Sequence, residues 1–138
     1  MASDKAKFIS AYTASGLTPD GSSTYFLAKH VGLLRAKELF LTNKMLSAEE
    51  AKQWGFVNEV VVHDNLTTKA NELARRFASG PTKAYGGVKR MLLSSFSSPI
   101  ESQLDNETRH IVGTMDTHDG PHGLNAFLNK ERPRFTGS

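Results

Sequence analysis

The sequence predicts a mainly helical fold with one or two short strands. Apolar residues recur every three or four positions through most of the chain, which places them on one face of successive α-helices. Only residues 56–62 combine β-branched and apolar residues in the run expected of a strand, while residues 8–12 could form a strand or a bend. The 138 residues suffice for one domain with a core.

The expected helices follow one another with short connections. Ser47 and Glu50 match a capping box, in which each side chain bonds a backbone amide at the start of a helix, and this helix should end at Gly55. Residues 15–23, with two glycines, a proline and an aspartate, predict a loop. The other helical patterns are 24–29, 33–40, 66–78, 85–96 after Pro81, 100–115 after Ser98-Pro99, and 124–128.

Composition excludes several classes of protein. The chain has no cysteine, which excludes disulfides, thiolate metal sites and cysteine nucleophiles. No apolar run reaches the roughly 18 residues needed to cross a membrane, and residues 1–7 lack the apolar core of a secretory signal, so we expect a cytoplasmic protein. The net charge of +3 comes from Lys and Arg spread over separate helical patterns, which favours solvated surface charge over a nucleic-acid interface.

Two histidines have a spacing that could bind a metal ion. His118 and His122 are four residues apart, which on a continuous helix would place both imidazoles on one face. Gly120-Pro121 lies between them, so we do not expect a continuous helix there, and no third ligand is evident. We therefore expect no metal site.

Four blocks of residues, in this order along the chain, resemble the crotonase superfamily. The most specific is Ser47-Ala48-Glu49-Glu50-Ala51 followed by Gly55-Phe56-Val57-Asn58. The others are Lys5-Ala6-Lys7-Phe8 with Gly16-Leu17-Thr18-Pro19-Asp20-Gly21, then Val31-Gly32 with Glu38-Leu39, and finally Gly80-Pro81-Thr82-Lys83-Ala84 with the ending Ala126-Phe127-Leu128-Asn129-Lys130. The resemblance covers nearly the whole chain. It implies the carboxy-terminal half of the α/β crotonase (ClpP/crotonase-like) fold, most similar to the enoyl-CoA isomerase-type branch.

The resemblance also implies two regions, treated as one domain. Residues 1–62 would be a remnant of the crotonase core, containing the acid-bearing loop, helices and one strand. Residues 63–138 would be a carboxy-terminal helical region that mediates oligomerisation. A complete relative has a stretch of similar length before Lys5, which holds most of the parallel sheet and the glycine-rich loop of the oxyanion hole. We expect that first half to be missing here.

Members of this family act on coenzyme A thioesters by stabilising an enolate. The resemblance therefore implies an acyl-CoA isomerase-type proton shuttle if the first half is supplied, and an inactive chain without it. The alternative is a non-catalytic helical module, derived from a crotonase, that oligomerises or binds acyl-CoA. Either way no separate cofactor is implied, because coenzyme A enters as part of the thioester substrate.

Asp20 is the candidate catalytic residue. In Thr18-Pro19-Asp20-Gly21 it resembles the single acid of enoyl-CoA isomerases and of the ring-opening isomerases of aromatic degradation. An aspartate held against an apolar acyl chain would have a raised pKa, suited to moving a proton. The alternative is that Asp20 only forms a turn with its neighbours or caps the helix that follows.

Phe127 and Lys130 are the candidate coenzyme A-binding residues. They match a carboxy-terminal pair that, in relatives, contacts the adenine and 3′-phosphate end of coenzyme A. The alternative for Phe127 is packing in the core. The alternative for Lys130 is a solvated helix end, where a cation also suits the helix dipole.

Apolar stripes predict a homo-oligomer. Without the first half of the fold, the stripes Leu33/Leu39/Phe40 and Leu66/Leu73/Phe77 lose the surface that would cover them. We expect either the trimer of the family or a dimer in which helices of one copy cover the other.

We predict negligible hydratase activity for this chain. A hydratase uses two carboxylates, and the second of them falls, by resemblance, four residues after Phe8, where this chain has Tyr12. A phenol is not a general base at neutral pH, because its pKa is about 10. Hydration of crotonyl-CoA should be measured at high protein concentration. Turnover within about 10³-fold of the roughly 10 per second of an ordinary enzyme would contradict the prediction.

Overall fold

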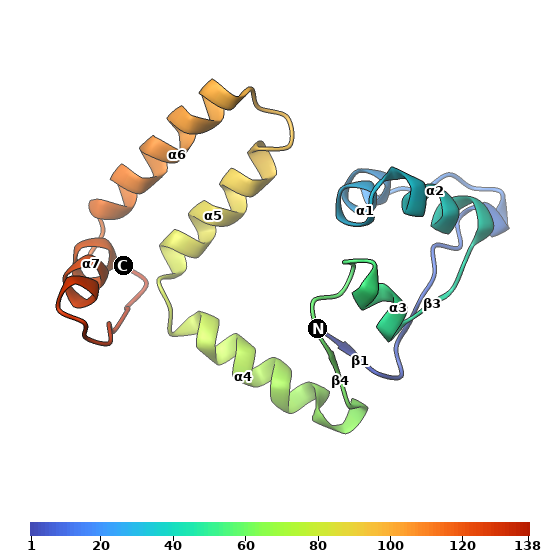
Figure 1. Ribbon diagram of the computed structural model, residues 1–138, viewed down its shortest axis with the longest axis horizontal. Coiled ribbons are helices and arrows are strands. Elements are labelled where there is room, and N and C mark those ends of the chain that lie inside the picture. The colour runs from blue at the N-terminus through green and yellow to red at the C-terminus, as the bar shows by residue number, and fades with distance from the viewer. The chain divides into compact units, whose positions relative to one another are not determined.

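The computed structural model describes residues 1–138, which pack as two compact units, residues 1–70 and 71–138. Helices dominate both units, and each strand is only two residues long (Figure 1). Helix α4 (Leu66–Ala78) runs across the boundary between the units. None of the helices combines the length and the apolar character that crossing a membrane requires. The mainly helical fold predicted from the sequence is confirmed.

The first unit contains two small sheets of two strands each. Strand β1 (Ala2–Ser3) pairs in parallel with β4 (Val60–Val61), and β2 (Lys7–Phe8) pairs antiparallel with β3 (Leu46–Ser47). Each sheet thereby joins the start of the chain to a segment far along the sequence. The helical elements are α1 (Ser23–Val31), α2 (Leu33–Thr42), α3 (Ala48–Gln53) and two 3-10 turns, η1 (Thr13–Ser15) and η2 (His63–Asn65).

The core of the first unit consists of two neighbouring apolar clusters. One contains Ala2, Leu39, Leu46, Ala51 and Val57, and the other contains Val31, Ala36 and Phe40. Leu27 and Trp54 pack against both clusters and so connect them.

Burial in this core corrects part of the first predicted stripe. Leu39 and Phe40 are 5% and 9% exposed, so they find their partners inside the unit. Of the three residues in this stripe, only Leu33, at 64% exposed, lies on the surface. The stripe therefore does not form an association surface as a whole.

The capping box is confirmed. Ser47 Oγ accepts a hydrogen bond from the Glu50 amide at 3.2 Å, and Glu50 Oε2 accepts one from the Ser47 amide at 2.9 Å. The pKa of Glu50 is lowered mainly by the hydrogen bond from the Ser47 amide and next by the one from the Ser47 hydroxyl, because both bonds favour the charged carboxylate. Gly55, with a φ of 80°, turns the chain after α3 in a conformation that side chains disfavour.

The strand expected over residues 56–62 is shorter than predicted. The amides of Phe56 and Val57 both donate to the carbonyl of Ala51 and thereby close the carboxyl end of α3. These amides are therefore not available to a sheet, and only Val60 and Val61 pair with another strand.

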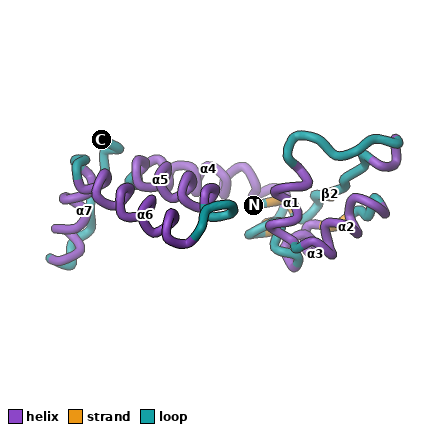
Figure 2. The backbone as a smooth tube through the Cα atoms, turned by 90° about the horizontal axis from the view of Figure 1, so that it is seen from above, coloured by secondary structure: helices purple, strands orange, loops and turns teal.

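The second unit exposes most of its apolar side chains. Helices α5 (Thr82–Ser94) and α6 (Ile100–Met115) lie side by side, and α7 (Asp119–Leu128) follows them (Figures 1 and 2). The polar side chain of Gln103, 7% exposed, bonds the carbonyl of Met91 and the hydroxyl of Ser94 across the α5–α6 hairpin. Ala126 is the one buried apolar side chain of the second unit. Ile100, Leu104 and Ile111 are all more than half exposed.

Helix α7 is continuous through Gly120-Pro121, contrary to the sequence-based expectation. Pro121 lies in the first turn of α7, where backbone nitrogens make no hydrogen bond within the helix, so its missing N–H costs nothing there. A side chain at Gly120 would be impossible, since its Cβ would lie 2.0 Å from the carbonyl oxygen of Thr114. The glycine thus permits a tight corner between α6 and α7.

The carboxy-terminal tail is bound to the start of α7 by one carboxylate. Asp119, 4% exposed, accepts hydrogen bonds from the amides of Thr136 at 2.8 Å and Gly137 at 2.7 Å. The bond from the Thr136 amide is the main reason that the pKa of Asp119 is lowered to about 2, and it outweighs the opposing effect of burial. The Asp119 amide in turn donates to the carbonyl of Ser138.

We predict that Asp119→Asn destabilises the fold in a pH-dependent way. Because the folded-state pKa lies near 2, below its ordinary value of 3.8, the charged carboxylate stabilises the fold at every pH above about 3.8. That stabilisation disappears as the pH falls toward 2. Urea unfolding at pH 7, 5 and 3 should therefore show a gap between parent and variant that narrows only at the lowest pH. Asp105→Asn, in an exposed ion pair, is the control and should change little; an Asp119→Asn gap that is equal at all three pH values would contradict the prediction.

We also predict that the chain self-associates through the apolar face of α6. Leu104 and Ile111 are 56% and 66% exposed, and burying such side chains contributes about 1.5–3 kcal/mol each. Equilibrium sedimentation at micromolar concentration should give a mass above the 15.1 kDa of one chain. The double variant Leu104→Glu/Ile111→Glu should lower this mass, whereas Ser102→Glu, at an exposed position on the opposite side of the same helix, should not. A parent mass near that of a single chain would show the prediction to be wrong.

Candidate active site

Tyr12 and Asp20 lie in contact in the first unit. The Tyr12 hydroxyl donates a hydrogen bond to Asp20 Oδ1 at 2.9 Å. Tyr12 directly precedes η1, and Asp20 stands in the loop before α1. The bond orients one oxygen of the exposed carboxylate and leaves Oδ2 for another partner. Sequence reasoning named both residues but did not expect them to touch.

The loop that carries Tyr12 is fixed against the carboxyl end of α2. Thr13 Oγ1 donates to the carbonyl of Phe40 at 2.6 Å, and Asn43 Oδ1 accepts the amide of Ala14 at 3.3 Å. The amide of Leu17 donates back to the carbonyl of Tyr12 at 3.0 Å. These bonds hold the Tyr12 backbone in place, so its hydroxyl approaches Asp20 from a defined direction.

The Asp20 carboxylate does not cap α1. The N-cap residue of α1 is Ser22, and no side chain accepts a capping bond there. Asp20 contributes to the turn only through its backbone carbonyl, which accepts from the amide and the hydroxyl of Ser23. The carboxylate is therefore available for chemistry, although the turn-forming interpretation holds for the backbone.

An apolar pocket of about 320 Å³ lies next to Tyr12. Five aromatic side chains contribute to its wall, namely Phe8, Tyr12, Phe26, Phe40 and Phe56. Ser10, Ser23 and His30 are its polar members. Asp20 does not line this pocket, but its partner Tyr12 does. A pocket of this composition can take an apolar group and exclude water around it.

Phe127 and Lys130 lie together at the end of α7 in the second unit. Phe127 is 78% exposed, so the core-packing alternative is wrong within this chain. Lys130 has a φ of 58° and occupies the turn after α7, where its amide donates to Phe127 and the amide of Glu131 donates to Ala126. Glycine is the usual residue at this position of a helix end, so a lysine adopts this conformation at an energetic cost.

His118 and His122 stack on each other, with ring centroids 5.8 Å apart. His122 Nε2 accepts the amide of Arg134 at 3.2 Å, and His118 Nδ1 lies 3.4 Å from Asp119 Oδ1. His118 Nδ1 also lies 3.4 Å from Thr136 Oγ1, so each of the two rings has a nitrogen that contacts the carboxy-terminal tail. No three His, Asp or Glu side chains are grouped so that they could hold a metal ion.

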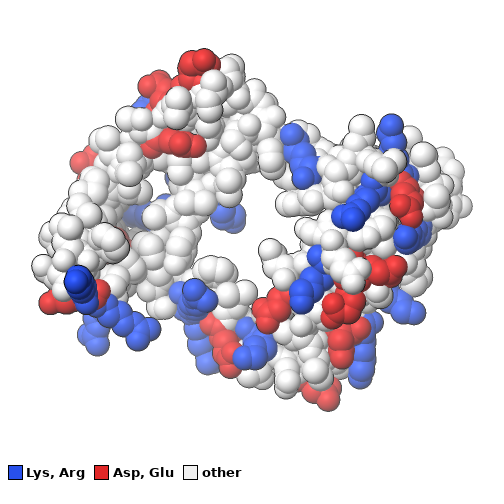
Figure 3. All heavy atoms as spheres, viewed as in Figure 1, with Lys and Arg blue, Asp and Glu red and all other residues white.

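Charged side chains of both signs are interspersed on the face of the molecule in Figure 3. No single-sign field of the kind that guides nucleic acids covers that face.

The sequence matches the family model for enoyl-CoA hydratase/isomerase over residues 1–138. Among curated relatives, the 1,2-epoxyphenylacetyl-CoA isomerase of Escherichia coli is 36% identical over 137 residues, which is 99% of this chain and 52% of the relative. A 4-chlorobenzoyl coenzyme A dehalogenase of Arthrobacter is 33% identical over 131 residues, 95% of this chain and 48% of the relative. The trans-2-decenoyl-[acyl-carrier-protein] isomerase of Streptococcus mutans is 31% identical, over 99% of this chain and 52% of the relative.

Solved structures show the same fold. The enoyl-CoA hydratase/isomerase of Cupriavidus metallidurans superposes with a TM-score of 0.91 at 33% identity, and covers 98% of this chain and 51% of its own. The enoyl-CoA hydratase of Bacillus anthracis gives a TM-score of 0.89 at 31% identity, over 99% and 53% of the two chains. The architecture is thus that of the carboxy-terminal half of a crotonase fold.

The chain belongs to the enoyl-CoA hydratase/isomerase family. It spans about half the length of the curated relatives that it matches.

Proposed function

We propose that this chain contributes the proton-transferring carboxylate of an acyl-CoA isomerase, with Asp20 as a single general base and acid. In such a reaction Asp20 removes a proton from the α or γ carbon of the acyl thioester, which forms the enolate, and returns the proton to the other of these two carbons, which shifts the double bond. One carboxylate suffices because the same group performs both transfers. The substrate would be an acyl-CoA thioester.

The contact between Tyr12 and Asp20 beside the apolar pocket is the observation that supports this proposal. An acyl chain in the pocket would lie next to Tyr12, whose hydroxyl bonds Oδ1 of Asp20 and leaves Oδ2 for the substrate. Tyr12 would therefore position Asp20 and would not itself transfer the proton.

The enolate requires an oxyanion hole in addition to the Asp20 carboxylate. An oxyanion hole consists of fixed backbone amides aimed at the developing negative charge, and removal of one donor costs about 10²–10³ in turnover. Relatives have about as much chain again outside the matched region. We propose that a segment equivalent to this unmatched part of the relatives provides the oxyanion hole and completes the isomerase.

Asp20→Asn should strongly reduce isomerase activity once the missing half of the fold is supplied. The assay combines this chain with the amino-terminal half of a related isomerase and follows the shift of a double bond in an enoyl-CoA. We expect a loss of about 10²-fold or more, because an amide cannot accept the proton. Glu59→Gln, an equal change of charge at an exposed position of the same unit, should retain full activity.

Tyr12→Phe tests in the same assay whether the Tyr12 hydroxyl positions the Asp20 carboxylate. Loss of the hydroxyl should lower kcat more than it changes KM, because the pocket wall stays aromatic while Asp20 loses its orientation. If Asp20→Asn and Tyr12→Phe both leave the rate unchanged, Asp20 is only a turn residue and the proposal is wrong.

A second candidate function rests on the exposed apolar side chains of the second unit. Phe127 is 78% exposed and Leu128 is 67% exposed, which suits contact with a partner. The same chain could thus act as a non-catalytic, oligomerising or acyl-CoA-binding module. Binding of acyl-CoA that is unaffected by Asp20→Asn, together with no isomerase activity in the completed protein, would favour this second candidate.

A further inference from the structure

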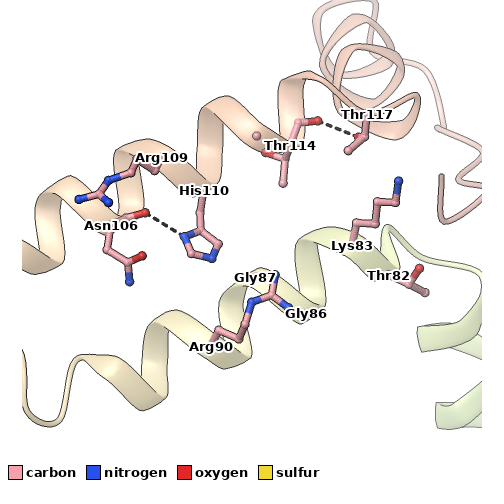
Figure 4. A pocket seen from close by; sticks show the side chains of 11 residues that line it. Thr82, Lys83, Gly86, Gly87, Arg90, Asn106, Arg109, His110, Thr114 and Thr117 are labelled. Carbon is pink, nitrogen blue, oxygen red and sulfur yellow. Dashed lines mark hydrogen bonds between the residues drawn. The ribbon is translucent and has the colours of Figure 1, made fainter.

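A groove of about 650 Å³ lies between α5 and α6, within the second unit (Figure 4). Both helices contribute to it along most of their length, from Thr82 to Arg90 on α5 and from Asn106 to Thr114 on α6, and Thr117 lines it just after α6. It is separate from the Tyr12 pocket, none of whose lining residues it shares. Its size falls within the range of about 300–1,000 Å³ that is usual for small-molecule sites.

The groove is lined by cations and by no carboxylate. Lys83, Arg90, Arg109 and His110 are among its 11 lining residues, which include no Asp or Glu. Arg109 is paired with Asp105, one turn earlier on α6, whereas no carboxylate is paired with Lys83 or Arg90. The groove therefore holds at least two positive charges that have no counter-charge from the protein.

The two unpaired cations share one face of α5. Lys83 and Arg90 are seven residues apart, which is two helical turns, or roughly 10 Å along the axis. Figure 4 shows Lys83 and Arg90 extending from α5 toward the space between the helices. Their flexible side chains can converge on one anion from both ends of the groove.

His110 faces these cations from α6. Its Nδ1 lies 2.9 Å from the carbonyl oxygen of Asn106, which can only accept a hydrogen bond, so Nδ1 carries the proton. Nε2 is then the nitrogen left for a ligand, and the ring projects between the helices (Figure 4). Opposite the ring, Gly87 is buried, and a Cβ there would already lie 3.5 Å from His110 Cδ2.

Three glycines keep the groove open. Gly86 and Gly87 lie between Lys83 and Arg90 on α5, and Gly113 lies on α6. Glycine in the middle of a helix is destabilising relative to alanine, so local helix stability does not explain them. At Gly113 a Cβ would meet nothing within 4 Å, which shows that the space beyond it is empty and that packing does not require glycine there.

We propose that the α5–α6 groove is a binding site for an organic phosphate. A phosphate group carries up to two negative charges and several acceptor oxygens, which match a guanidinium and an ammonium that approach from one helix. From the other helix, Nε2 of His110 can accept the hydrogen bond of a P–OH group, because Nδ1 carries the proton of the ring. A bare phosphate would fill only a small part of the groove, so the remainder accommodates the organic portion of the ligand. The site is independent of Asp20 and of the proposed isomerase activity.

Titration of the 138-residue chain with ADP tests the proposal, with inorganic phosphate and adenosine as separate arms. Affinity is measured by calorimetry, and the amide signals of Gly86, Gly87 and Gly113 are followed by NMR. ADP should bind more tightly than phosphate, adenosine should not bind measurably, and the three glycine signals should shift. Lys83→Ala and Arg90→Ala should each weaken ADP binding roughly tenfold or more, as expected for loss of a charged hydrogen bond.

Two further variants distinguish specific binding in the groove from non-specific attraction to surface charge. Lys89→Ala removes a cation from the same helix but outside the groove, and should leave ADP binding unchanged. Gly113→Leu keeps every cation and adds a side chain to the groove wall at a position where a Cβ would meet nothing within 4 Å, and it should weaken ADP binding while the helix remains folded by circular dichroism. No binding of ADP overturns the proposal. So does binding that Lys89→Ala weakens as much as Arg90→Ala, or binding that Gly113→Leu leaves intact.

Discussion

The packing of Leu46 is the interaction on which the first unit depends. It is 1% exposed and is the one large side chain that is completely enclosed. Its strand, β3, pairs with β2, and its neighbours in the cluster come from β1, α2, α3 and the segment that follows α3. Because Tyr12 follows β2 by four residues and is held against the end of α2, this packing also determines where the Tyr12 hydroxyl meets Asp20. Burial of a few aliphatic side chains thus sets the geometry of a polar site.

The second unit is stabilised differently. Its helices are connected by polar contacts, through Gln103 in the hairpin and Asp119 at the tail, while most of its large apolar side chains face outward. A polar network that is fully bonded can specify a geometry without a large core. The consequence is a pair of helices whose facing surfaces are left partly open, with glycine, lysine and arginine where a compact bundle would have aliphatic side chains. The groove and the exposed apolar face are two results of this arrangement.

Local chemistry made the helices predictable. Ser47 and Glu50 define the start of α3 through bonds three residues apart, and the apolar period places α2, α4, α5 and α6 within a few residues of their observed bounds. The prediction was wrong where the backbone makes a non-periodic bond. The amides of Phe56 and Val57 close a helix instead of entering a strand, and Gly120 allows α7 to begin where a proline suggested a break.

The sequence by itself determined the family, the helical pattern and the candidate residues Asp20, Phe127 and Lys130, because these depend on residue order and short-range spacing. Only the tertiary structure decided that Leu39 and Phe40 are buried while Phe127 is exposed, and that Tyr12 bonds the Asp20 carboxylate. It also decided that Asp119 binds the tail. Burial and long-range hydrogen bonds depend on which surfaces meet, and a periodic pattern identifies an apolar face without identifying what covers it.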